Sequence, residues 1–546
     1  MTWPNSCWRT RPSPARNSCG SSRERRRKPS RKGGADVWKK IFIPRLAFAL
    51  LAILLQLGLL VGMVLRFQEY FGFFYGGSLL VSAVAVVWIL NDRSNPAYKI
   101  AWIIPILLFP VFGGIFYLLF GRPDLDNTTK RRMGPIMGKV AESLPREEEL
   151  LAALKEECPP AAHQARYIRD YAHCPPCDRT EAEYLPTGEL KFARLKEVLR
   201  KAERYIFLEY FIIEEGVLWD SVLEILLEKA GEGVDVRLIY DDAGCLFTLP
   251  ERYDRKLEAM GIRCCVFNPL GPVFSLKVNN RDHRKLVVVD GHTGFTGGIN
   301  LADEYINEYV KYGHWKDSAI LLRGAAVWSM SLMFLSMWEY LRREEEDWEA
   351  FRPKSMPLGT GEAQGGCVQP FADNPLDGEP VGETVYLNII NKAQRYVHIT
   401  SPYLIIDSAM ASALCNASKG GVDVRIVTPN HPDKKYVHAV TRSYYGMLLE
   451  SGVKIYEYTP GFIHSKTFVA DGLYGVVGTI NMDYRSLYLH FECGVWIYRN
   501  RALQAMEEDF RALLEVSRPI GMEDVWGTPW YRTLGRFLLR VFAPLL

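Results

Sequence analysis

The sequence predicts an α/β protein in which two similar halves pack about a pseudo-twofold axis, preceded by N-terminal transmembrane helices. Three observations lead to this prediction: long apolar runs before residue 121, alternating strand-like and helix-like patterns after about residue 180, and an internal repeat within that later part. With 546 residues, the chain is several times longer than a typical domain, so we expect more than one folded unit.

The overall composition excludes several classes of protein. Hydrophobic residues make up 48% and charged residues 24%, which excludes disorder throughout the chain. The net charge is only +3, which argues against a dedicated nucleic-acid binder. The 11 cysteines are scattered and odd in number, so they do not indicate the disulfide framework of a secreted protein.

The N-terminal region divides into a basic segment and an apolar one. Residues 1–40 carry many arginines and lysines, which predicts a disordered basic arm. Within residues 41–121, three uncharged runs are each long enough to cross a bilayer as a helix, at residues 46–65, 71–90 and 100–120. We expect two to three transmembrane helices, because basic residues on both sides of the region favour the same, cytoplasmic face. Either the third run, with Pro105, Pro110 and Gly113, is re-entrant, or one basic segment is translocated.

The rest of the chain repeats itself. Residues 201–209 match residues 392–400, and Gly-Val-Asp-Val-Arg occurs both at Gly233 and at Gly421. Because the order of the matches is preserved, we expect two βα halves on sheets. The boundaries we predict are a linker at 122–180, a first half at 181–350, a connector at 351–385, a second half at 386–520 and an amphipathic C-terminal segment at 521–546.

The C-terminal segment has two faces. Arg532, Arg536 and Arg540 lie four residues apart, beside apolar residues such as Leu534 and Phe537. This pattern is typical of a helix in a membrane interface, but it fits equally well a helix that packs on the body of the protein.

Within the repeat lie two copies of one pattern, His-x-Lys-x4-Asp-Gly. The first copy has His283, Lys285 and Asp290, and the second has His464, Lys466 and Asp471. Asn300 and Asn481 each follow their histidine by seventeen residues. One copy could arise by chance, but two copies in register with an independent repeat indicate a functional site.

The spacing predicts how these side chains are used. Along a strand, His283 and Lys285 project to the same side, as do His464 and Lys466. If the halves pack about a twofold axis, both sets converge on one pocket that suits a phosphodiester. The ammonium and amide groups would hold the phosphate oxygens, one imidazole would attack phosphorus, and the other would protonate the leaving alkoxide.

The acidic residues are expected to support this pocket. Asp290 and Asp471 lie an odd number of positions from their histidines, so we include them in the catalytic motif but expect them to brace a turn or the contact between the two halves. Asp317 and Glu492, each about thirty residues past its histidine, are candidates to accept the second imidazole N–H and fix the tautomer. No metal-ligand spacing accompanies the motif, so we expect neither a metal nor a cofactor.

The paired motifs resemble those of the phospholipase D superfamily, and further segments resemble its bacterial cardiolipin synthase branch. The resemblance covers roughly residues 41–546 and includes Glu209-Tyr-Phe, Asp241-Asp, Trp315-Lys-Asp and Asp483-Tyr-Arg-Ser. It implies a duplicated phospholipase D-like fold and transfer of a phosphatidyl group from one phosphatidylglycerol to a second, releasing glycerol. A phosphatidyl-histidine intermediate is implied, with His283 as nucleophile and His464 as acid and then base, although pseudo-symmetry permits the reverse.

The resemblance also implies a place in the cell and leaves alternatives open. It indicates a multi-pass protein of the cell membrane with its catalytic part on the cytoplasmic side, acting on phosphatidylglycerol and other membrane lipids and not on nucleic acid. A hydrolase of the phospholipase D type, or another phosphatidyltransferase, would use the same pocket. A non-catalytic membrane scaffold is the third alternative. The sequence does not indicate an oligomeric state.

Overall fold

The computed structural model describes residues 68–92, 94–109, 127–269, 280–353 and 365–545, together with isolated positions within 51–65 and 113–117. The predicted basic arm at 1–40 lies outside the described residues, and the first apolar run at 46–65 is described only at isolated positions.

The first half is built on a seven-stranded sheet with the strand order β1-β8-β6-β5-β2-β3-β4. Strands β2, β3 and β4 are parallel, and the remaining pairs are antiparallel. The bounds are β1 (Thr180–Leu185), β2 (Tyr205–Tyr210), β3 (Asp235–Asp241), β4 (Arg263–Phe267), β5 (Lys285–Val289), β6 (Thr293–Gly297) and β8 (Ala319–Gly324). Every residue of β2 and β5 is buried. Neither strand therefore shows the alternation of apolar and polar residues that is typical of a strand with one exposed face.

The second half repeats this sheet and adds one strand. Its order is β17-β12-β11-β10-β14-β15-β16-β9, so that seven strands correspond one to one with those of the first sheet and β17 is extra. The bounds are β9 (Cys367–Asp373), β10 (Tyr396–Thr400), β11 (Asp423–Pro429), β12 (Lys454–Tyr458), β14 (Thr467–Ala470), β15 (Tyr474–Gly478), β16 (Glu492–Tyr498) and β17 (Ser517–Ile520). The α/β fold of two duplicated halves predicted from the sequence is therefore confirmed.

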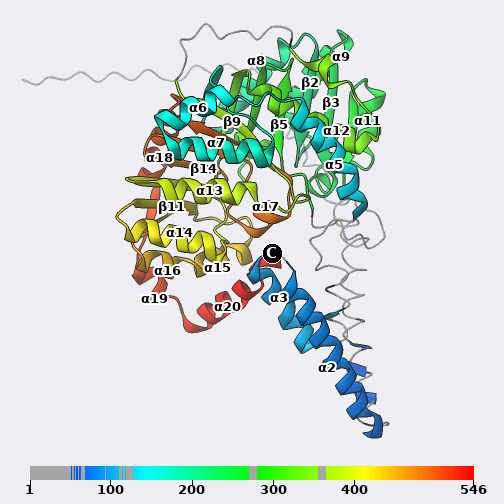
Figure 1. Cartoon of the computed structure of the whole chain (residues 1–546), viewed down its shortest axis with the longest axis vertical. Coiled ribbons are helices and arrows are strands. Elements are labelled where there is room, and N and C mark those ends of the chain that lie inside the picture. Colours follow the sequence, from blue (N-terminus) through cyan, green and yellow to red (C-terminus); the bar gives the residue numbers. More distant parts are fainter. Residues whose placement is uncertain are drawn as a thin grey trace, which may run out of the picture.

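Helices cover both sheets (Figure 1). They are α5 (Asn127–Glu142), α6 (Glu148–Glu157), α7 (Pro159–Ala172), α8 (Gly188–Arg200), α9 (Val217–Gly231), α10 (Asp242–Cys245), α11 (Tyr253–Ala259), α12 (Val327–Arg342), α13 (Val381–Lys392), α14 (Ser408–Lys419), α15 (Lys435–Ser443), α16 (Tyr445–Glu450), α17 (Tyr484–Tyr488), α18 (Ala502–Glu515), α19 (Met522–Trp526) and α20 (Trp530–Val541), with short 3-10 turns η3 (Asp303–Ile306), η4 (Trp348–Phe351) and η5 (Ala543–Leu545). One apolar core contains residues of both halves and nearly all of α12. A second core lies under α8, α9 and α11 of the first half.

Two stretches expected to be connecting segments contain regular structure. The stretch 122–180 contains α5, α6 and α7, and the stretch 351–385 contains β9. The residues of β9 pair with β16 along their whole length, from Cys367 opposite Tyr498 to Asp373 opposite Glu492. Proline and glycine near β9 made this stretch look like a linker, because a single short edge strand leaves little periodic signal.

Helices α2 (Gln68–Asn91) and α3 (Pro96–Leu108) extend away from the body (Figure 1). Within the part of the chain that the structure describes, no helix combines the length and the apolar character needed to cross a membrane. The third apolar run does not continue as one helix, because α3 ends at Leu108. Gly113 packs so closely on α3 that a Cβ atom there would lie 2.5 Å from the carbonyl oxygen of Pro105, so only glycine fits at this position.

Candidate active site

The two halves are joined by backbone pairing at the centre of the molecule. Strand β7 (His314–Lys316) of the first half pairs in parallel with β13 (Gly461–Ile463) of the second, and Asp282 bridges Phe491 in the same way. His283 N–H donates to the Phe491 carbonyl at 2.9 Å, and His464 N–H donates to the Lys316 carbonyl at 2.7 Å. Each motif histidine is thus held by the other half, just before the first residue of β5 or β14.

The imidazole–carboxylate pairs are exchanged between the halves. Nδ1 of His283 lies 2.9 and 3.0 Å from the two carboxylate oxygens of Glu492, and Nδ1 of His464 lies 2.7 Å from Oδ2 of Asp317. Both carboxylates are completely buried. A carboxylate at Nδ1 fixes the ring tautomer, so that Nε2 is the nitrogen available for chemistry.

The pocket favours neutral imidazoles when no anion is bound. Burial, together with the ammonium groups of Lys285 and Lys466, lowers the pKa of His283 well below its usual range. Burial and the same two lysines lower the pKa of His464 in the same way. Burial also raises the pKa of Asp317 to about 6. Because each histidine is influenced by the lysines of both halves, the two motifs share one electrostatic environment.

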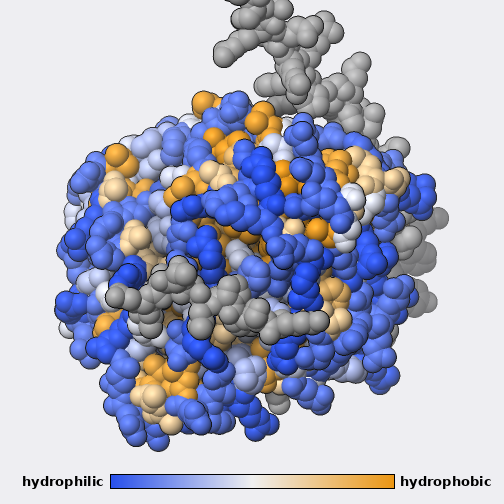
Figure 2. Space-filling view, turned by 90° about the horizontal axis from the view of Figure 1, so that it is seen from above, coloured by the Kyte–Doolittle hydropathy of each residue, from blue (hydrophilic) through white to orange (hydrophobic). Residues whose placement is uncertain are grey.

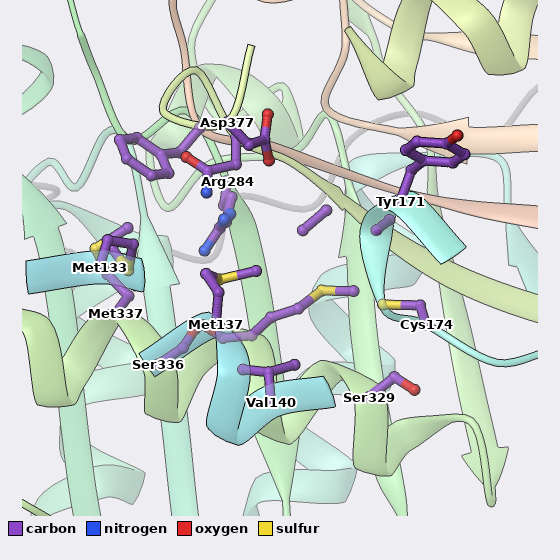
Figure 3. Close-up of a pocket in the computed structure, with 15 residues that line it drawn as sticks. Met133, Met137, Val140, Tyr171, Cys174, Arg284, Ser329, Ser336, Met337 and Asp377 are labelled. Atoms are coloured by element: carbon purple, nitrogen blue, oxygen red, sulfur yellow. Dashed lines mark hydrogen bonds between the residues drawn. The ribbon is translucent and has the colours of Figure 1, made fainter. Parts of the chain in front are cut away.

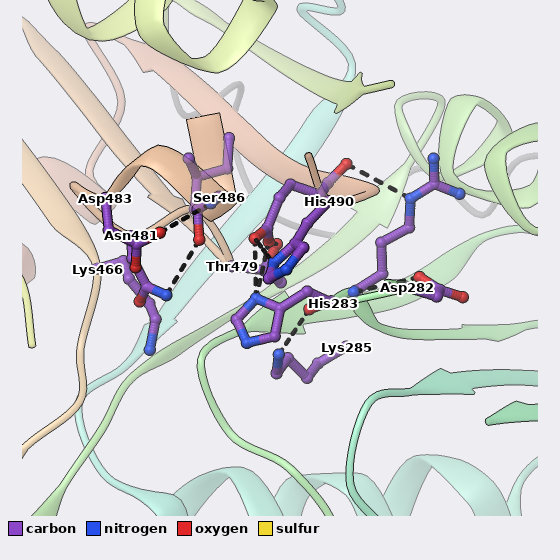
Figure 4. A network of polar contacts seen from close by, with 12 residues as sticks. Asp282, His283, Lys285, Lys466, Thr479, Asn481, Asp483, Ser486 and His490 are labelled. Atoms are coloured by element: carbon purple, nitrogen blue, oxygen red, sulfur yellow. Dashed lines mark hydrogen bonds and ion pairs between the residues drawn. The ribbon is translucent and has the colours of Figure 1, made fainter. Parts of the chain in front are cut away.

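The two motif lysines are buried, and each ammonium group donates to a neutral backbone carbonyl. Burial lowers the pKa of Lys285 to about 7 and that of Lys466 to about 8. Lys285 Nζ donates to the carbonyl of His283 at 2.5 Å, and Lys466 Nζ donates to the carbonyl of His464. Figure 4 shows Lys466 and Asn481 of the second half approaching His283 and Lys285 of the first. An anion placed among these groups would be favourable, because it would offset the desolvation of both ammonium groups.

The two asparagines that follow the motifs differ in how they are bonded. Asn300 Oδ1 accepts the N–H of Ile212 at 3.1 Å, and its amide donates to the Tyr305 hydroxyl at 2.7 Å. Asn481 donates to the Ser486 hydroxyl at 3.1 Å, whereas its Oδ1 is buried with no hydrogen-bond partner among the described residues. Asn300 is therefore fully engaged within its own half, and Asn481 retains an unused oxygen.

Asp290 and Asp471 lie at the opposite end of β5 and β14 from the histidines. The carboxylate of Asp290 accepts the backbone N–H groups of Glu203, Arg204 and Tyr205 at 2.8–2.9 Å. The carboxylate of Asp471 accepts those of Gln394, Arg395 and Tyr396 at 2.7–2.9 Å. Both aspartates have positive φ, 53° and 57°. This geometry agrees with the expected brace of a turn and places neither carboxylate at the imidazoles.

The site contains two side chains that the motif analysis did not identify, Thr479 and His490. The Thr479 hydroxyl donates to Glu492, and the His490 ring lies 5.6 Å from the His283 ring between centroids (Figure 4). Burial lowers the pKa of His490 to about 4. Comparing equivalent positions of the two halves could have identified them. Thr479 occupies the position of Gly298 in the first half, and His490 occupies the position of Trp315, so the halves differ at both places.

Those two positions make the halves chemically different. The ring of Trp315 lies 5.6 Å from that of His464 between centroids, and in the equivalent place of the other half the ring of His490 lies beside that of His283. Gly298 leaves room for Asp317, since a Cβ atom there would lie 2.1 Å from Oδ1 of that carboxylate. The longer Glu492 instead has a threonine beside it. The two imidazoles, although related by pseudo-symmetry, therefore have different second neighbours.

The surroundings of His283 include a group of potential metal ligands. One ligand atom each from His283, His490 and Glu492 lies within 4.8 Å of the others. A separate cavity is lined by methionines of α5 and α12 together with Arg284 and Phe491, the sequence neighbours of His283 and Glu492 (Figure 3). Arg284 pairs with the buried Glu209 at 3.3 Å and faces that cavity, so it is not directed at the imidazoles.

Comparisons with known proteins agree with this architecture. A family model described as "Cardiolipin synthase, PLD-like domain" matches residues 195–311 and 386–514, and one described as "Phospholipase_D-nuclease N-terminal" matches residues 80–122. The chain is 34% identical to a cardiolipin synthase of Halalkalibacterium halodurans and 36% identical to one of Geobacillus kaustophilus, in each case over 86% of this chain and 93% of the relative. An uncharacterised protein of Streptococcus mutans is 41% identical over 85% of this chain and 99% of its own.

Among solved structures, the crystal structure of phosphatidylserine synthase from Haemophilus influenzae is similar with a TM-score of 0.53 and 15% sequence identity. The match covers 70% of this chain and 99% of that one. At this identity the likeness concerns the fold alone.

Proposed function

This chain belongs to the phospholipase D-like cardiolipin synthase family, and we propose that it transfers a phosphatidyl group from one phosphatidylglycerol to the hydroxyl of a second, forming cardiolipin and releasing glycerol. The observation that carries this proposal is the exchange of carboxylates between the halves, which assembles both histidines and both lysines into one centre. Such a centre is suited to a single phosphorus atom.

Substrate binding is the first part of the mechanism. The ammonium groups of Lys285 and Lys466 bind the non-bridging oxygens of the phosphodiester and stabilise the charge that develops in the transition state. Asn481 contributes the second N–H of its amide from the second half, and Asn300 acts by holding Tyr305, whose ring lies 5.7 Å from that of His464. The bound anion also favours protonation of one imidazole, which the empty pocket disfavours.

In the first chemical step, Nε2 of neutral His283 attacks phosphorus while Glu492 accepts the hydrogen bond from Nδ1–H. The bond between phosphorus and the glycerol oxygen breaks, and protonated His464 gives its Nε2 proton to that oxygen. The products are free glycerol and a phosphatidyl group bound to His283. Asp317 stabilises the charged form of His464 before the proton is transferred.

In the second step, His464 acts as a base. It takes the proton from a glycerol hydroxyl of the second phosphatidylglycerol, and the resulting oxygen attacks phosphorus. The phosphorus–nitrogen bond breaks, so that His283 returns to its neutral form and His464 to its protonated form. The two identical lipids thus play different roles, as phosphatidyl donor and as acceptor.

We also propose that the enzyme is held at the cell membrane by its N-terminal apolar region, with the catalytic body on the cytoplasmic side. Support comes from the large exposed apolar side chains of α2 and α3, which include Phe73, Leu80 and Leu108. The cytoplasmic side follows from the basic residues on both sides of this region. Protease protection of the body in oriented vesicles tests the side.

Product analysis tests the proposed reaction. Purified protein is supplied with phosphatidylglycerol labelled in its acyl chains, and the lipids are identified by mass spectrometry. Cardiolipin with an equal amount of glycerol supports transfer between lipids. Phosphatidic acid as the main product would show that water is the acceptor and that the chain is a hydrolase. His283→Ala controls for contaminating activity.

A further inference from the structure

The C-terminal helix α20 has two distinct surfaces. Trp530, Leu534, Phe537 and Val541 recur at helical spacing and, with the neighbouring Tyr531 and Leu538, form an apolar arc. The three arginines at positions 532, 536 and 540 form a second arc on the other side. None of the twelve residues of the helix is buried, and Trp530 is 77% exposed.

The arginine arc, and not the apolar arc, faces the protein. The Arg540 guanidinium lies 4.1 Å from the ring centroid of Tyr444 and donates to the Ser443 carbonyl at 3.4 Å. Arg536 donates to the Thr528 hydroxyl at 3.3 Å, and Leu539, between the arcs, packs against the core. A helix on the surface of a soluble domain normally has the opposite orientation, with its apolar face against the core.

Helix α20 lies beside the apolar N-terminal helices. Helix α20 contacts α3 and α15, and Leu545 of the following turn packs on the cluster of Trp102 and Ile106 between α2 and α3. Figure 1 shows α20 at the same end of the molecule as the base of α2 and α3. The face seen in Figure 2, at the opposite end, is mostly hydrophilic with scattered apolar residues. Apolar patches of this kind mark interaction surfaces.

We propose that α20 lies in the surface of an anionic lipid bilayer, with its apolar arc among the acyl chains and Arg532 at the level of the phosphate groups. Charge favours this partner, because Arg532 is exposed and the helix contains no acidic residue. Tryptophan and tyrosine at its first turn are typical of the interface between water and lipid. The proposal depends on the proposed function only in its choice of phosphatidylglycerol as the anionic lipid.

This arrangement would set the distance between the bilayer and the catalytic centre. Helix α15, on which α20 packs, begins at Lys435, directly after Lys434. The charge of Lys434 acts on both His283 and His464, so α15 extends from the edge of the site to α20. A lipid headgroup beside α20 therefore lies about the length of α15, about 14 Å at 1.5 Å per residue, from the edge of the site.

A fluorophore on α20 tests the position of the helix directly. Leu538→Cys is labelled in the full chain, which is placed in nanodiscs containing phosphatidylglycerol with or without brominated acyl chains. Val217→Cys on α9 is the matched control, since Leu538 is 58% and Val217 50% exposed. Wild-type protein treated identically gives the background from native cysteines. We expect bromine to lower the emission at position 538 about twofold and to leave position 217 unchanged, because interfacial helices reach the acyl chains.

Equal quenching at the two positions would overturn the proposal. So would a label at 538 that is shielded from a water-soluble quencher but not reached by bromine, because a second copy of the chain would then cover the helix. The quenching measurements do not depend on turnover. A protein that makes no cardiolipin could still show quenching at position 538, so failure of the proposed function is distinguishable from failure of this proposal.

Paired charge substitutions test the consequence for catalysis. Leu534→Glu with Phe537→Glu places two carboxylates in the apolar arc, where both side chains are exposed and folding is not at risk. We expect transfer in phosphatidylglycerol nanodiscs to fall about tenfold or more, while the rate with monomeric short-chain phosphatidylglycerol is unchanged. Leu190→Glu with Val217→Glu on α8 and α9 is the control. Unchanged transfer in nanodiscs, or equal losses in both assays, would contradict a role of α20 at the bilayer.

Discussion

His283 in the first half forms its imidazole–carboxylate pair with Glu492 in the second half, at 2.9 Å. The reciprocal pair, His464 with Asp317, has the same exchanged arrangement at 2.7 Å. Neither motif histidine forms this pair within its own half. Each motif histidine therefore depends on a carboxylate of the other half, as expected if the duplicated halves form one centre and not two independent sites.

The first prediction concerns the length of the two carboxylate side chains. Glu492→Asp withdraws the carboxylate from His283 by about one carbon–carbon bond, about 1.5 Å. We expect kcat to fall about 10- to 100-fold, as is usual when the partner that orients a functional imidazole is lost. Melting temperature and kcat are measured together. The reciprocal Asp317→Glu pushes the carboxylate toward His464, whose Nδ1 already lies 2.7 Å away, and should also lose activity. Wild-type kcat in Glu492→Asp would show that this pairing is not required.

A second prediction separates the motif aspartates from catalysis. Asp290→Asn leaves an amide facing three backbone N–H donors, and we expect a loss of about 1–3 kcal/mol of unfolding free energy. Asparagine tolerates the positive φ of this position, so the loss reports on hydrogen bonds and not on backbone strain. Thermal or denaturant unfolding measures it, with the exposed Asp220→Asn as control. A large fall in kcat at unchanged stability would instead place Asp290 in the chemistry.

The sequence predicts much of the fold and of the site because the relevant signals are local. The paired motifs lie at the starts of β5 and β14, which are short, apolar and buried on both faces, and such strands are recognisable without tertiary information. The strand correspondence between the halves follows the repeated segments that begin at Lys201 and Lys392. The family resemblance follows from the same residues.

The exchange of carboxylates could not be predicted, because it arises from the pairing of β7 with β13 and not from sequence distance. Counting along the chain relates Asp317 to His283 and Glu492 to His464, whereas packing reverses both relationships. The full engagement of Asn300 depends on Tyr305 in a turn with no periodic pattern. His490 stands alone in an apolar stretch, where a histidine is usually a core residue, so the sequence does not indicate a role for it.

The third prediction is a pH dependence that originates from the lysines. Burial lowers the pKa of Lys285 to about 7 and that of Lys466 to about 8, and only the ammonium form binds the phosphate. We therefore expect kcat/KM to fall as the pH rises through this range, because kcat/KM reports the free enzyme. Lys285→Arg retains its charge and should move the fall to higher pH, toward the pKa of Lys466. A profile that still rises between pH 7 and 9 would contradict this role.

The same shifts predict the effect of pH on stability. Between about pH 8 and 10 the unfolded chain keeps both lysines protonated, whereas the folded chain does not. The unfolded state therefore binds more protons, and the two lysines should make folding more favourable as the pH rises. Denaturant unfolding at pH 8 and pH 10, compared between the wild type and Lys285→Met, isolates this contribution. An identical pH dependence in both proteins would contradict it.

The fourth prediction concerns metal ions. Because lysines and imidazoles supply the positive charge in the proposed mechanism, we expect a chelator such as EDTA to leave the transfer rate unchanged. Reversible loss of activity that a divalent ion restores would contradict this mechanism. In that event, His490→Gln would show whether the group of His283, His490 and Glu492 holds the ion, since the variant removes one of its three ligands.

In the proposed reaction, one imidazole attacks the phosphorus of the donor lipid while its counterpart from the other half transfers the proton. Peptide mass spectrometry of enzyme quenched during turnover of phosphatidylglycerol tests this most directly. We expect a phosphatidyl adduct on the peptide that contains His283, absent from His283→Ala. An adduct on His464 would reverse the roles of the two histidines, and cardiolipin formation by His283→Ala without any adduct would rule out a phosphatidyl-histidine intermediate at this position.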